Sequence, residues 1–300
     1  SAPGLPGDGL LIRTRKGVIV LMYGDSSTFF WSWDDDTGKP ASNVRRNVWS
    51  IRSLDGGETW TDRQMVMEGY CGALITMIQA STGEIVVPVQ RLMYDPGRNA
   101  TSTYVSTDDG ATWTNSNTID LGGYGHHDGA FEATLAELKD GRLLMLIRTT
   151  LDRFWEAYSE DKGRSWLEFR PTDLDASNAP GYLARLSSGR LVFVWNRLYP
   201  DGENMSPRKA GWSTQAWSSN HRDELSISFS EDEGRSWSEP VVFARNPRHT
   251  VGVLMSDGSV MRTGGISYPK IFERRPGELW ITTGFQGRLR VSMQESDFIK

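Results

Sequence analysis

An eight-residue motif that occurs four times constrains the fold of this chain more than any other feature. Each copy reads Ser-x-Asp-x-Gly-x-x-Trp, and the copies span residues 53–60, 106–113, 159–166 and 230–237. The first two intervals between copies are each 53 residues (106 − 53 and 159 − 106), and the third is 71 (230 − 159). A period of this size is typical of a repeated supersecondary unit. We therefore expect a series of similar units, with an insertion in the third interval.

Each motif predicts a hydrogen-bonded turn between two strands. The Asp carboxylate accepts hydrogen bonds from backbone N–H groups of the turn, and the Gly supplies a positive φ angle. The Trp anchors the turn by burying a large ring. We expect a structural role for these residues, because the alternative, a calcium-binding loop, would need the alternating ligands of an EF-hand.

The composition is that of a folded, all-β chain. It has 31 Gly and 13 Pro, with 11% aromatic and 38% hydrophobic residues. The net charge of −5 weighs against nucleic acid as a partner, and no segment approaches the roughly 20 apolar residues of a membrane span. The single cysteine, Cys71, excludes an internal disulfide and a cysteine-rich metal site. Since the chain begins Ser-Ala-Pro-Gly, we expect that a leader, tag or preceding domain has been removed, and a secreted or periplasmic location is favoured over the cytoplasm.

The segments between the motifs read as β-hairpins around x-Gly turns. The predicted strand pairs are 10–13 with 18–23, 73–79 with 85–90, 133–138 with 143–148, 182–186 with 191–196, and 267–272 with 279–283. Further strands lead into the motifs, at 48–52, 103–106, 154–159 and 225–230, and segment 289–293 closes the chain. About 50 residues per four-stranded unit gives roughly six units in 300 residues. The sequence thus predicts an all-β, six-bladed β-propeller of four-stranded antiparallel blades. We expect a single domain over residues 1–300, with an inserted loop near 201–220.

The motif is identified as the Asp box, or BNR repeat, of the sialidase (neuraminidase) superfamily, which the chain resembles over nearly its whole length. The resemblance implies an exo-glycoside hydrolase that releases a terminal acidic sugar, sialic acid, by a retaining mechanism. Members hold the sugar carboxylate with three arginines and use a Tyr nucleophile, a Glu partner and an Asp acid. A neutral phenol suits this substrate, because a carboxylate nucleophile would be repelled by the sugar's own carboxylate. No cofactor or metal is implied, and the expected partner is an acidic sugar or glycoconjugate.

Four residues match the family's pattern in order. Glu132 opens a segment that resembles Glu-Pro-x-x-x-Glu-Leu-x-Asp-Gly-x-Leu, and Arg148 ends the strand that follows. Arg222 precedes the fourth motif by one strand, and Tyr268 comes later, within Ile-Ser-Tyr-Pro. The resemblance implies that Tyr268 is the nucleophile, that Glu132 draws its proton, and that both arginines bind the carboxylate. The alternatives are a surface Glu, salt-bridged arginines and a buried strand Tyr.

The chain departs from the family at two places. The opening Arg-Ile-Pro segment of the family corresponds to Leu5-Pro6-Gly7, which lacks the arginine, and Arg13 lies later on that strand. The loop that carries the family's acid contains instead a run of charges: Asp34, Asp35, Asp36, Arg45 and Arg46. Either of these arginines is a replacement for the missing one, and any of the aspartates is a candidate acid. The alternative is a solvated charge run.

A second constellation, His126-His127-Asp128 between two glycines, lies just before Glu132. We expect a general acid or a substrate contact here, and the alternative is a structural loop. A metal site shared by both histidines is disfavoured, because adjacent residues on extended backbone point to opposite sides.

Strand-end arginines are further candidates for substrate contact or for salt bridges: Arg91, Arg185 and Arg197. Tryptophans in predicted loops are candidates for stacking on sugar rings: Trp31, Trp33, Trp212 and Trp217. Glu137 is expected to be structural. Two other functions remain open. One is hydrolysis or elimination at a different acidic sugar, such as a uronate, and the other is a non-catalytic propeller that binds carbohydrate or protein.

Overall fold

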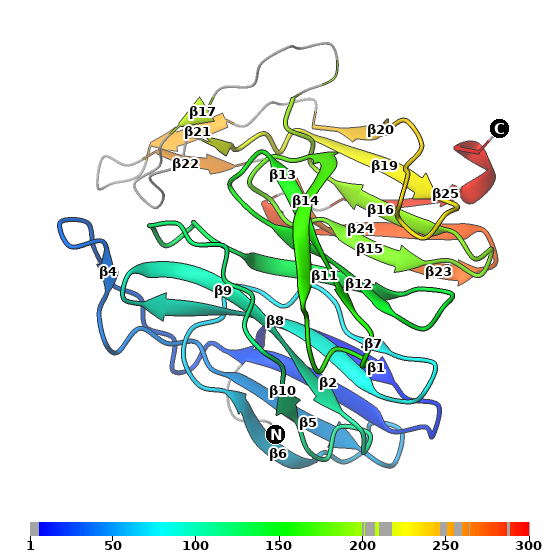
Figure 1. The fold of residues 1–300 in the computed structure, drawn as a ribbon, viewed down its shortest axis with the longest axis horizontal. Helices are drawn as coiled ribbons and strands as arrows, with labels where there is room; N and C mark the ends of the chain where they lie inside the picture. The colour runs from blue at the N-terminus through cyan, green and yellow to red at the C-terminus, as the bar shows by residue number, and fades with distance from the viewer. Residues whose placement is uncertain are drawn as a thin grey trace. The chain divides into compact units, whose positions relative to one another are not determined.

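The computed structural model describes residues 6–199, 201, 208–209, 218–246, 251–254, 260–263, 265–286 and 289–299. In these residues the chain is all-β apart from one turn of 3-10 helix, η1 (Glu295–Asp297). Five antiparallel sheets have the strand pattern of propeller blades, and we number them 1 to 5 in chain order (Figure 1). No helix in these residues is long and apolar enough to cross a membrane.

Four blades have four strands and the fifth has three. Blade 1 has the order β1-β2-β5-β6, with strands Pro6–Arg13, Ile19–Asp25, Val48–Ser53 and Thr61–Met67. Blade 2 has the order β7-β8-β9-β10, with strands Ile78–Gln79, Ile85–Tyr94, Gly97–Ser106 and Thr114–Asn115. Blade 3 has the order β11-β12-β13-β14, with strands Phe131–Glu137, Leu143–Arg148, Arg153–Ser159 and Glu168–Asp175. Blade 4 has the order β15-β16-β19-β20, with strands Tyr182–Arg185, Leu191–Trp195, Glu224–Ser230 and Val241–Arg245. Blade 5 has the order β23-β24-β25, with strands Ile266–Arg275, Glu278–Gln286 and Arg290–Gln294.

Three small hairpins lie outside the blades. They are β3 (Trp33–Asp34) with β4 (Lys39–Pro40), β17 (Arg208–Lys209) with β18 (Ser218–Ser219), and β21 (Val251–Leu254) with β22 (Val260–Thr263). Most of the predicted insertion near 201–220 lies outside the described residues, as do Trp212 and Trp217.

The chain divides into two compact units. The first comprises Ser1–Thr149, Trp155–Arg170 and Ala210–Trp217, and the second comprises Thr150–Phe154, Pro171–Lys209 and Ser218–Lys300. Blades 1 and 2 and most of blade 3 belong to the first unit, and blades 4 and 5 belong to the second. The single-domain organisation stays a prediction.

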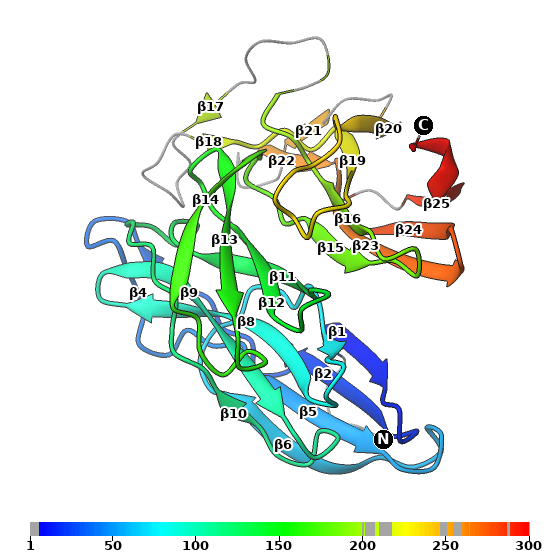
Figure 2. The ribbon, with the colours of Figure 1, turned by 45° about the vertical axis from the view of Figure 1, so that its right-hand side comes forward.

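In the first unit, β8 is buried on both faces, which explains its unbroken apolar run. Ile85, Val87 and Val89 pack with blade 1 in one core, which also holds Val20 and Met22 of β2. Val86 points the other way, because side chains alternate along a strand, and joins a second core with β11 and β12 of blade 3. Figures 1 and 2 show β8 between these two neighbours. In the second unit, one core joins blades 4 and 5.

The five predicted x-Gly turns are all present, and each turn glycine has a positive φ: Gly17, Gly83, Gly141, Gly189 and Gly277. A carboxylate from the next blade caps two of these turns. Glu137 accepts hydrogen bonds from the backbone N–H and hydroxyl of Ser81, both at 2.6 Å, and Glu273 does the same for Ser187 at 2.7 Å. The structural role predicted for Glu137 is confirmed.

The prediction of six blades is wrong for the described residues, which form five. Dividing the chain length by 50 counted loop residues as blade residues. The connection between β2 and β5 alone takes residues 26–47 and contains the β3–β4 hairpin. Segment 73–79 also differs from expectation, since only Ile78–Gln79 forms a strand.

Each motif closes the turn between the third and fourth strands of its blade. In the third copy, Ser159 donates to Asp161 at 2.8 Å and accepts from the N–H of Gly163 at 2.8 Å. Asp161 in turn accepts from the N–H and hydroxyl of Ser165 at 2.8 and 2.6 Å. Burial raises the pKa of Asp161, but these hydrogen bonds outweigh burial and the pKa lies below its usual value. Equivalent bonds form around the aspartates of the other copies, Asp55, Asp108 and Asp232.

The motif tryptophans differ in burial, and two of them bind the preceding blade. The indole N–H of Trp166 donates to the Thr103 hydroxyl on β9 at 2.8 Å, and Trp113 donates to Ser50 on β5 at 2.9 Å. Trp166 is 1% exposed, whereas Trp60 is 38% exposed. The burial expected of each motif tryptophan therefore holds for Trp166 and fails for Trp60.

This difference predicts unequal effects on stability. Trp166→Phe should lower the free energy of unfolding by about 1–2 kcal/mol, because it removes a buried hydrogen bond and leaves a gap between blades 2 and 3. Trp60→Phe is the matched control and should change it by less than about 0.5 kcal/mol. Urea denaturation measures both variants, and equal losses would contradict this role for Trp166.

Candidate active site

Glu132 and Arg148 form a buried ion pair at one end of blade 3. Glu132 lies in a β-bulge, since the pairing of β11 with β12 shifts between Phe131 and Thr134, and its φ is 46°. A positive φ is strained for a residue with a side chain, and bulges of this kind re-aim side chains beside active sites. Here Nη1 of Arg148 donates to Oε2 of Glu132, and their side chains are only 3% and 6% exposed.

The surroundings of this pair are partly aromatic. The guanidinium carbon of Arg148 lies 4.3 Å from the centre of the Phe131 ring, close enough for a cation–π interaction. A carboxylate and a guanidinium buried together stabilise each other, and removal of either leaves an uncompensated charge. The pair therefore presents a fixed carboxylate oxygen and several fixed N–H donors at one end of the blade.

Arg46 belongs to the same neighbourhood. Burial raises the pKa of the Cys71 thiol to about 12, the positive charge of Arg46 opposes this shift, and the negative charge of Glu132 adds to it. Nη1 of Arg46 donates to the backbone carbonyls of Cys71 at 3.1 Å and Gly72 at 2.5 Å. These bonds occupy carbonyls where strand 73–79 was expected to begin, and they hold Arg46 in place. Arg13, in contrast, lies beside Gly17, at the turn end of blade 1.

Arg91 lies close to this group. It is half-buried on β8 opposite Ala100. Burial raises the pKa of the Tyr104 phenol, the charge of Arg91 opposes that shift, and Cys71 adds to it. Arg91 and Arg46 thus both act on groups around Cys71.

The His126–Asp128 segment is a tight turn, so the expectation that the two histidines point to opposite sides is wrong. Their ring centres are 4.4 Å apart. Asn99 holds the turn, because its side chain donates to the carbonyl of His126 at 2.7 Å and its N–H donates to the carbonyl of Asp128 at 2.8 Å. Gly129 packs so closely on Asn99 that a Cβ there would meet the Asn99 carbonyl oxygen at 2.1 Å. Across the described ranges, no group of three or more His, Cys, Asp or Glu side chains is placed to hold a metal ion.

The three residues of this turn have different environments. Burial lowers the pKa of His126 to about 4, so its ring is neutral at neutral pH and is a poor general acid there. Asp128 is buried and accepts a hydrogen bond from the N–H of Tyr124 at 3.3 Å. His127 is half-buried, and its ring centre lies 6.4 Å from that of Phe131, the residue before Glu132.

The aspartates of the charge run lie at the exposed tip of the β3–β4 hairpin. Asp34 accepts hydrogen bonds from the N–H groups of Asp36 at 2.9 Å and Thr37 at 3.2 Å, and the hydrogen bonds from Thr37 lower the pKa of Asp34. Asp34 therefore stabilises the turn. Arg45 is exposed and donates to the carbonyl of Thr28 at 3.2 Å.

In the second unit, Arg222 and Tyr268 lie together. Tyr268 has a φ of 57°, an uncommon angle for a bulky residue, and the β23–β24 ladder pairs Ser267 and Pro269 but skips Tyr268. The guanidinium carbon of Arg222 lies 5.7 Å from the Tyr268 ring centre. Arg222 is held by the carbonyl of Asn178 at 2.8 Å and the hydroxyl of Ser267 at 3.4 Å.

Two further arginines of the second unit form ion pairs. Arg197 pairs with Asp175 at 3.0 Å, and Arg185 pairs with Glu233 at 2.5 Å near the β15–β16 turn. These contacts favour the salt-bridge alternative for both residues.

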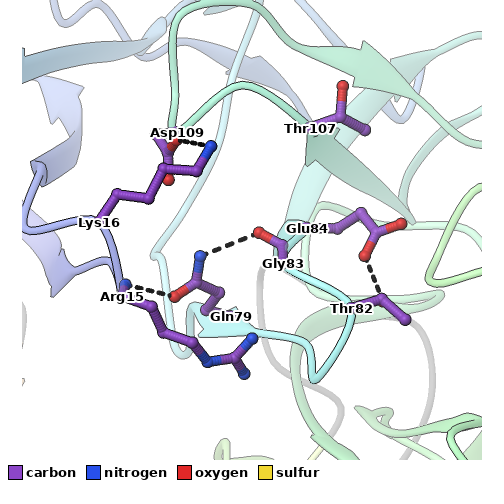
Figure 3. Close-up of a pocket in the computed structure, with 8 residues that line it drawn as sticks. All are labelled: Arg15, Lys16, Gln79, Thr82, Gly83, Glu84, Thr107 and Asp109. Carbon is purple, nitrogen blue, oxygen red and sulfur yellow. Dashed lines mark hydrogen bonds and ion pairs between the residues drawn. The ribbon is translucent and has the colours of Figure 1, made fainter.

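Figure 3 shows a cavity of about 320 Å³ in the first unit, lined by Arg15, Lys16, Gln79, Thr82, Gly83, Glu84, Thr107 and Asp109. It lies at the hairpin-turn end of blades 1 and 2. Lys16 pairs with Asp109 at 2.8 Å, and Glu84 binds Thr82 and Arg164. Because these charges neutralise one another, the cavity has no group poised for catalysis.

Two contact residues were missed from the sequence. Tyr70 packs against Trp31 with ring centres 4.7 Å apart, and Asn178 holds Arg222. Tyr70 carries a usable signal, a Gly-flanked aromatic just after a strand. Asn178 carries none, since its role depends on a contact with a residue 44 positions away.

Comparison with known proteins agrees with this architecture. The family model described as a BNR repeat-like domain matches residues 7–281. A sialidase of Paraclostridium sordellii is 26% identical over 194 residues, which are 58% of this chain and 45% of that protein. The chain therefore spans less than half of this relative.

Solved structures share the fold at low sequence identity. A Hadza microbial sialidase superposes with a TM-score of 0.65 at 16% identity, covering 98% of this chain and 53% of that one. An α-L-arabinofuranosidase of Fusarium graminearum superposes with a TM-score of 0.55 at 12% identity, covering 95% and 76%.

The buried ion pair predicts non-additive effects on stability. Glu132→Gln and Arg148→Met should each lower the free energy of unfolding by about 3–5 kcal/mol, because each leaves one buried charge unpaired. The double variant should lose clearly less than the sum of the two. Urea denaturation of the four proteins completes the cycle, and additive losses would show that the two residues do not interact.

The environment of His126 predicts a pH dependence. Since its folded-state pKa of about 4 lies below the ordinary 6.5, the unfolded chain takes up the proton first, and stability is lost as the pH falls through this range. Between pH 7 and 4 the wild type should lose at most about 3 kcal/mol more than His126→Gln. Urea denaturation at several pH values measures the difference, and parallel pH profiles would be the contrary result.

Proposed function

Because this chain belongs to the BNR repeat-like domain family of the sialidase superfamily, we propose that it is a glycoside hydrolase that releases a terminal sialic acid with retention of configuration. Tyr268 is the proposed nucleophile and Glu132 its base. Arg148 and Arg222 are the proposed ligands of the sugar carboxylate, and Arg46 takes the place of the arginine that the opening segment lacks.

One observation carries this proposal. Among the described residues of the first strands of the blades, β1, β7, β11, β15 and β23, only Glu132 and Tyr268 are non-glycine residues with a positive φ. Such a conformation costs on the order of 1–3 kcal/mol and persists where function requires a side chain to be aimed. Each of the two residues also has an arginine beside it, Arg148 and Arg222 respectively.

The proposed reaction has two steps. The Tyr268 oxygen forms a bond to the anomeric carbon while its proton passes to Glu132, and the glycosidic C–O bond breaks as a general acid protonates the leaving oxygen. Water then attacks the anomeric carbon of the tyrosyl intermediate, and the phenol recovers its proton. Two inversions give net retention. The mechanism requires Tyr268 and Glu132 to meet the same sugar.

His127 is the proposed general acid. It adjoins Phe131 and is half-buried, so that a leaving group can reach it. Asp128 is buried within its turn, Asp34 stabilises the β3–β4 turn, and His126 is neutral at neutral pH.

A second candidate keeps the hydrolase and changes the sugar. The opening segment lacks the family's first arginine, and a solved α-L-arabinofuranosidase shares the fold. A fluorogenic uronide and a fluorogenic arabinofuranoside therefore belong in the assay. Turnover of one of these with none of the sialoside would reassign the substrate.

Hydrolysis of a fluorogenic aryl sialoside tests the proposal. Tyr268→Phe should reduce turnover to background, since no nucleophile remains, and Glu132→Gln should reduce kcat by about 100-fold or more. Tyr158→Phe is the matched control, because the Tyr158 hydroxyl bonds Glu156 on β13. Full activity of Tyr268→Phe would remove the nucleophile assignment, and a wild type inactive on all three substrates would remove the hydrolase.

A further inference from the structure

The connection between β2 and β5 carries an aromatic surface in addition to its charges. Phe29, Trp31 and Trp33 alternate along it, and Tyr70 from the segment after β6 joins them. The ring centres of Trp31 and Tyr70 are 4.7 Å apart, those of Phe29 and Tyr70 are 6.5 Å apart, and those of Trp31 and Trp33 are 6.3 Å apart with planes 6° from parallel. We call these four residues the aromatic platform.

The platform is only partly covered by protein. Phe29 is 51% exposed, and the other three side chains are half-buried. A connection of this length with its own hairpin is uncommon in a compact fold, and such loops are usually functional. Solvent-exposed rings gathered in this way mark a binding surface.

The platform is held rigidly. Lys39 of the hairpin pairs with Asp95 at the β8–β9 turn at 2.9 Å, and the Tyr124 hydroxyl donates to the carbonyl of Thr37 at 2.6 Å. Trp33 packs so closely on Gly97 that a Cβ there would lie 2.4 Å from its ring. Both ribbon views show β4 beside the β8–β9 hairpin (Figures 1 and 2). Rings held in this way lose little freedom when a ligand binds.

Ring contacts connect the platform to Glu132. The His126 ring contacts Trp31 and Trp33 edge-on at 4.9 and 5.1 Å, and His127 lies next to His126 and 6.4 Å from Phe131. Phe131 immediately precedes Glu132. On the other side, Arg46 is bridged through its backbone to Tyr70. The platform therefore borders the proposed acid and the proposed base within one unit.

The chemistry of the platform suits an uncharged ligand. Its rings carry no charge, and burial keeps His126 beneath them neutral. The connection 26–47 has three carboxylates and three cations, Asp34, Asp35, Asp36, Lys39, Arg45 and Arg46, so it has no net charge to attract an anion. The C–H face of a neutral pyranose stacks well on an aromatic ring and removes apolar surface from water.

We propose that the aromatic platform is a subsite for a neutral hexose, which is the leaving-group sugar next to the sialic acid. The assignment rests on the proposed function for the order of the two sugars. The platform then selects substrates in which sialic acid is attached to a neutral oligosaccharide, and it places the glycosidic oxygen beside His127.

Binding of lactose by ligand-observed NMR titration tests the subsite without any catalytic step. Trp31→Ala should weaken lactose binding at least about tenfold, and Phe29→Ala should weaken it less, since Phe29 lies at the exposed edge. Phe169→Ala, an exposed aromatic on β14 of the same unit, is the matched control and should bind lactose as the wild type does. Thermal denaturation establishes that each variant is folded.

The outcomes separate the subsite from the hydrolase. Lactose binding that is absent in the wild type, or unchanged in both Trp31→Ala and Phe29→Ala, would overturn the subsite. In hydrolysis, Trp31→Ala should lose at least about tenfold in kcat/KM on sialyllactose and little on an aryl sialoside, and equal losses on both would also overturn it. Lactose binding that depends on Trp31, in a protein that hydrolyses no sialoside, would uphold the subsite and reject the proposed hydrolysis.

Discussion

The indole N–H of a motif tryptophan, donated to a hydroxyl on the blade before it, is the interaction on which the order of the first unit depends. Trp113 reaches Ser50 and Trp166 reaches Thr103, and each acceptor lies three residues before the serine that opens the preceding motif. The Ser–Asp–Gly hydrogen bonds of each motif fix the turn from which the tryptophan extends. One short sequence pattern therefore forms the turn and also positions the next sheet. Neighbouring sheets that are fixed in this way can carry strained residues on their first strands.

Strain on the first strands is the second recurring element. Glu132 sits in a bulge and Tyr268 at a skipped ladder position, both with left-handed backbone, in two different blades. In each case an arginine lies next to the strained residue. The pairing of a re-aimed side chain with a guanidinium suits a substrate that carries both a reacting carbon and a carboxylate. The aromatic platform adds an uncharged surface beside the first of these pairs.

The sequence predicted the hairpins better than it predicted their number. Alternation and x-Gly turns placed nearly every blade strand within a few residues, because both signals are local. Five such hairpins were visible, and the count of six arose from chain length, which includes the long β2–β5 connection. Segment 73–79 alternates like a strand but is mostly irregular, because part of its backbone is bound by Arg46, whose contact no local pattern reveals. The same limit applies to the two histidines, whose tight turn depends on Asn99, and to the contact of Trp31 with His126.

The central claim is that Tyr268 and Glu132 act on one sugar, and a crystal structure of the protein with a bound sialic acid analogue tests it most directly. The account predicts that the Tyr268 hydroxyl lies within hydrogen-bond reach of a Glu132 carboxylate oxygen, about 2.6–3.2 Å, with the analogue's carboxylate on Arg148 and Arg222. A separation of more than about 8 Å between these two side chains, with the analogue bound elsewhere, would contradict it.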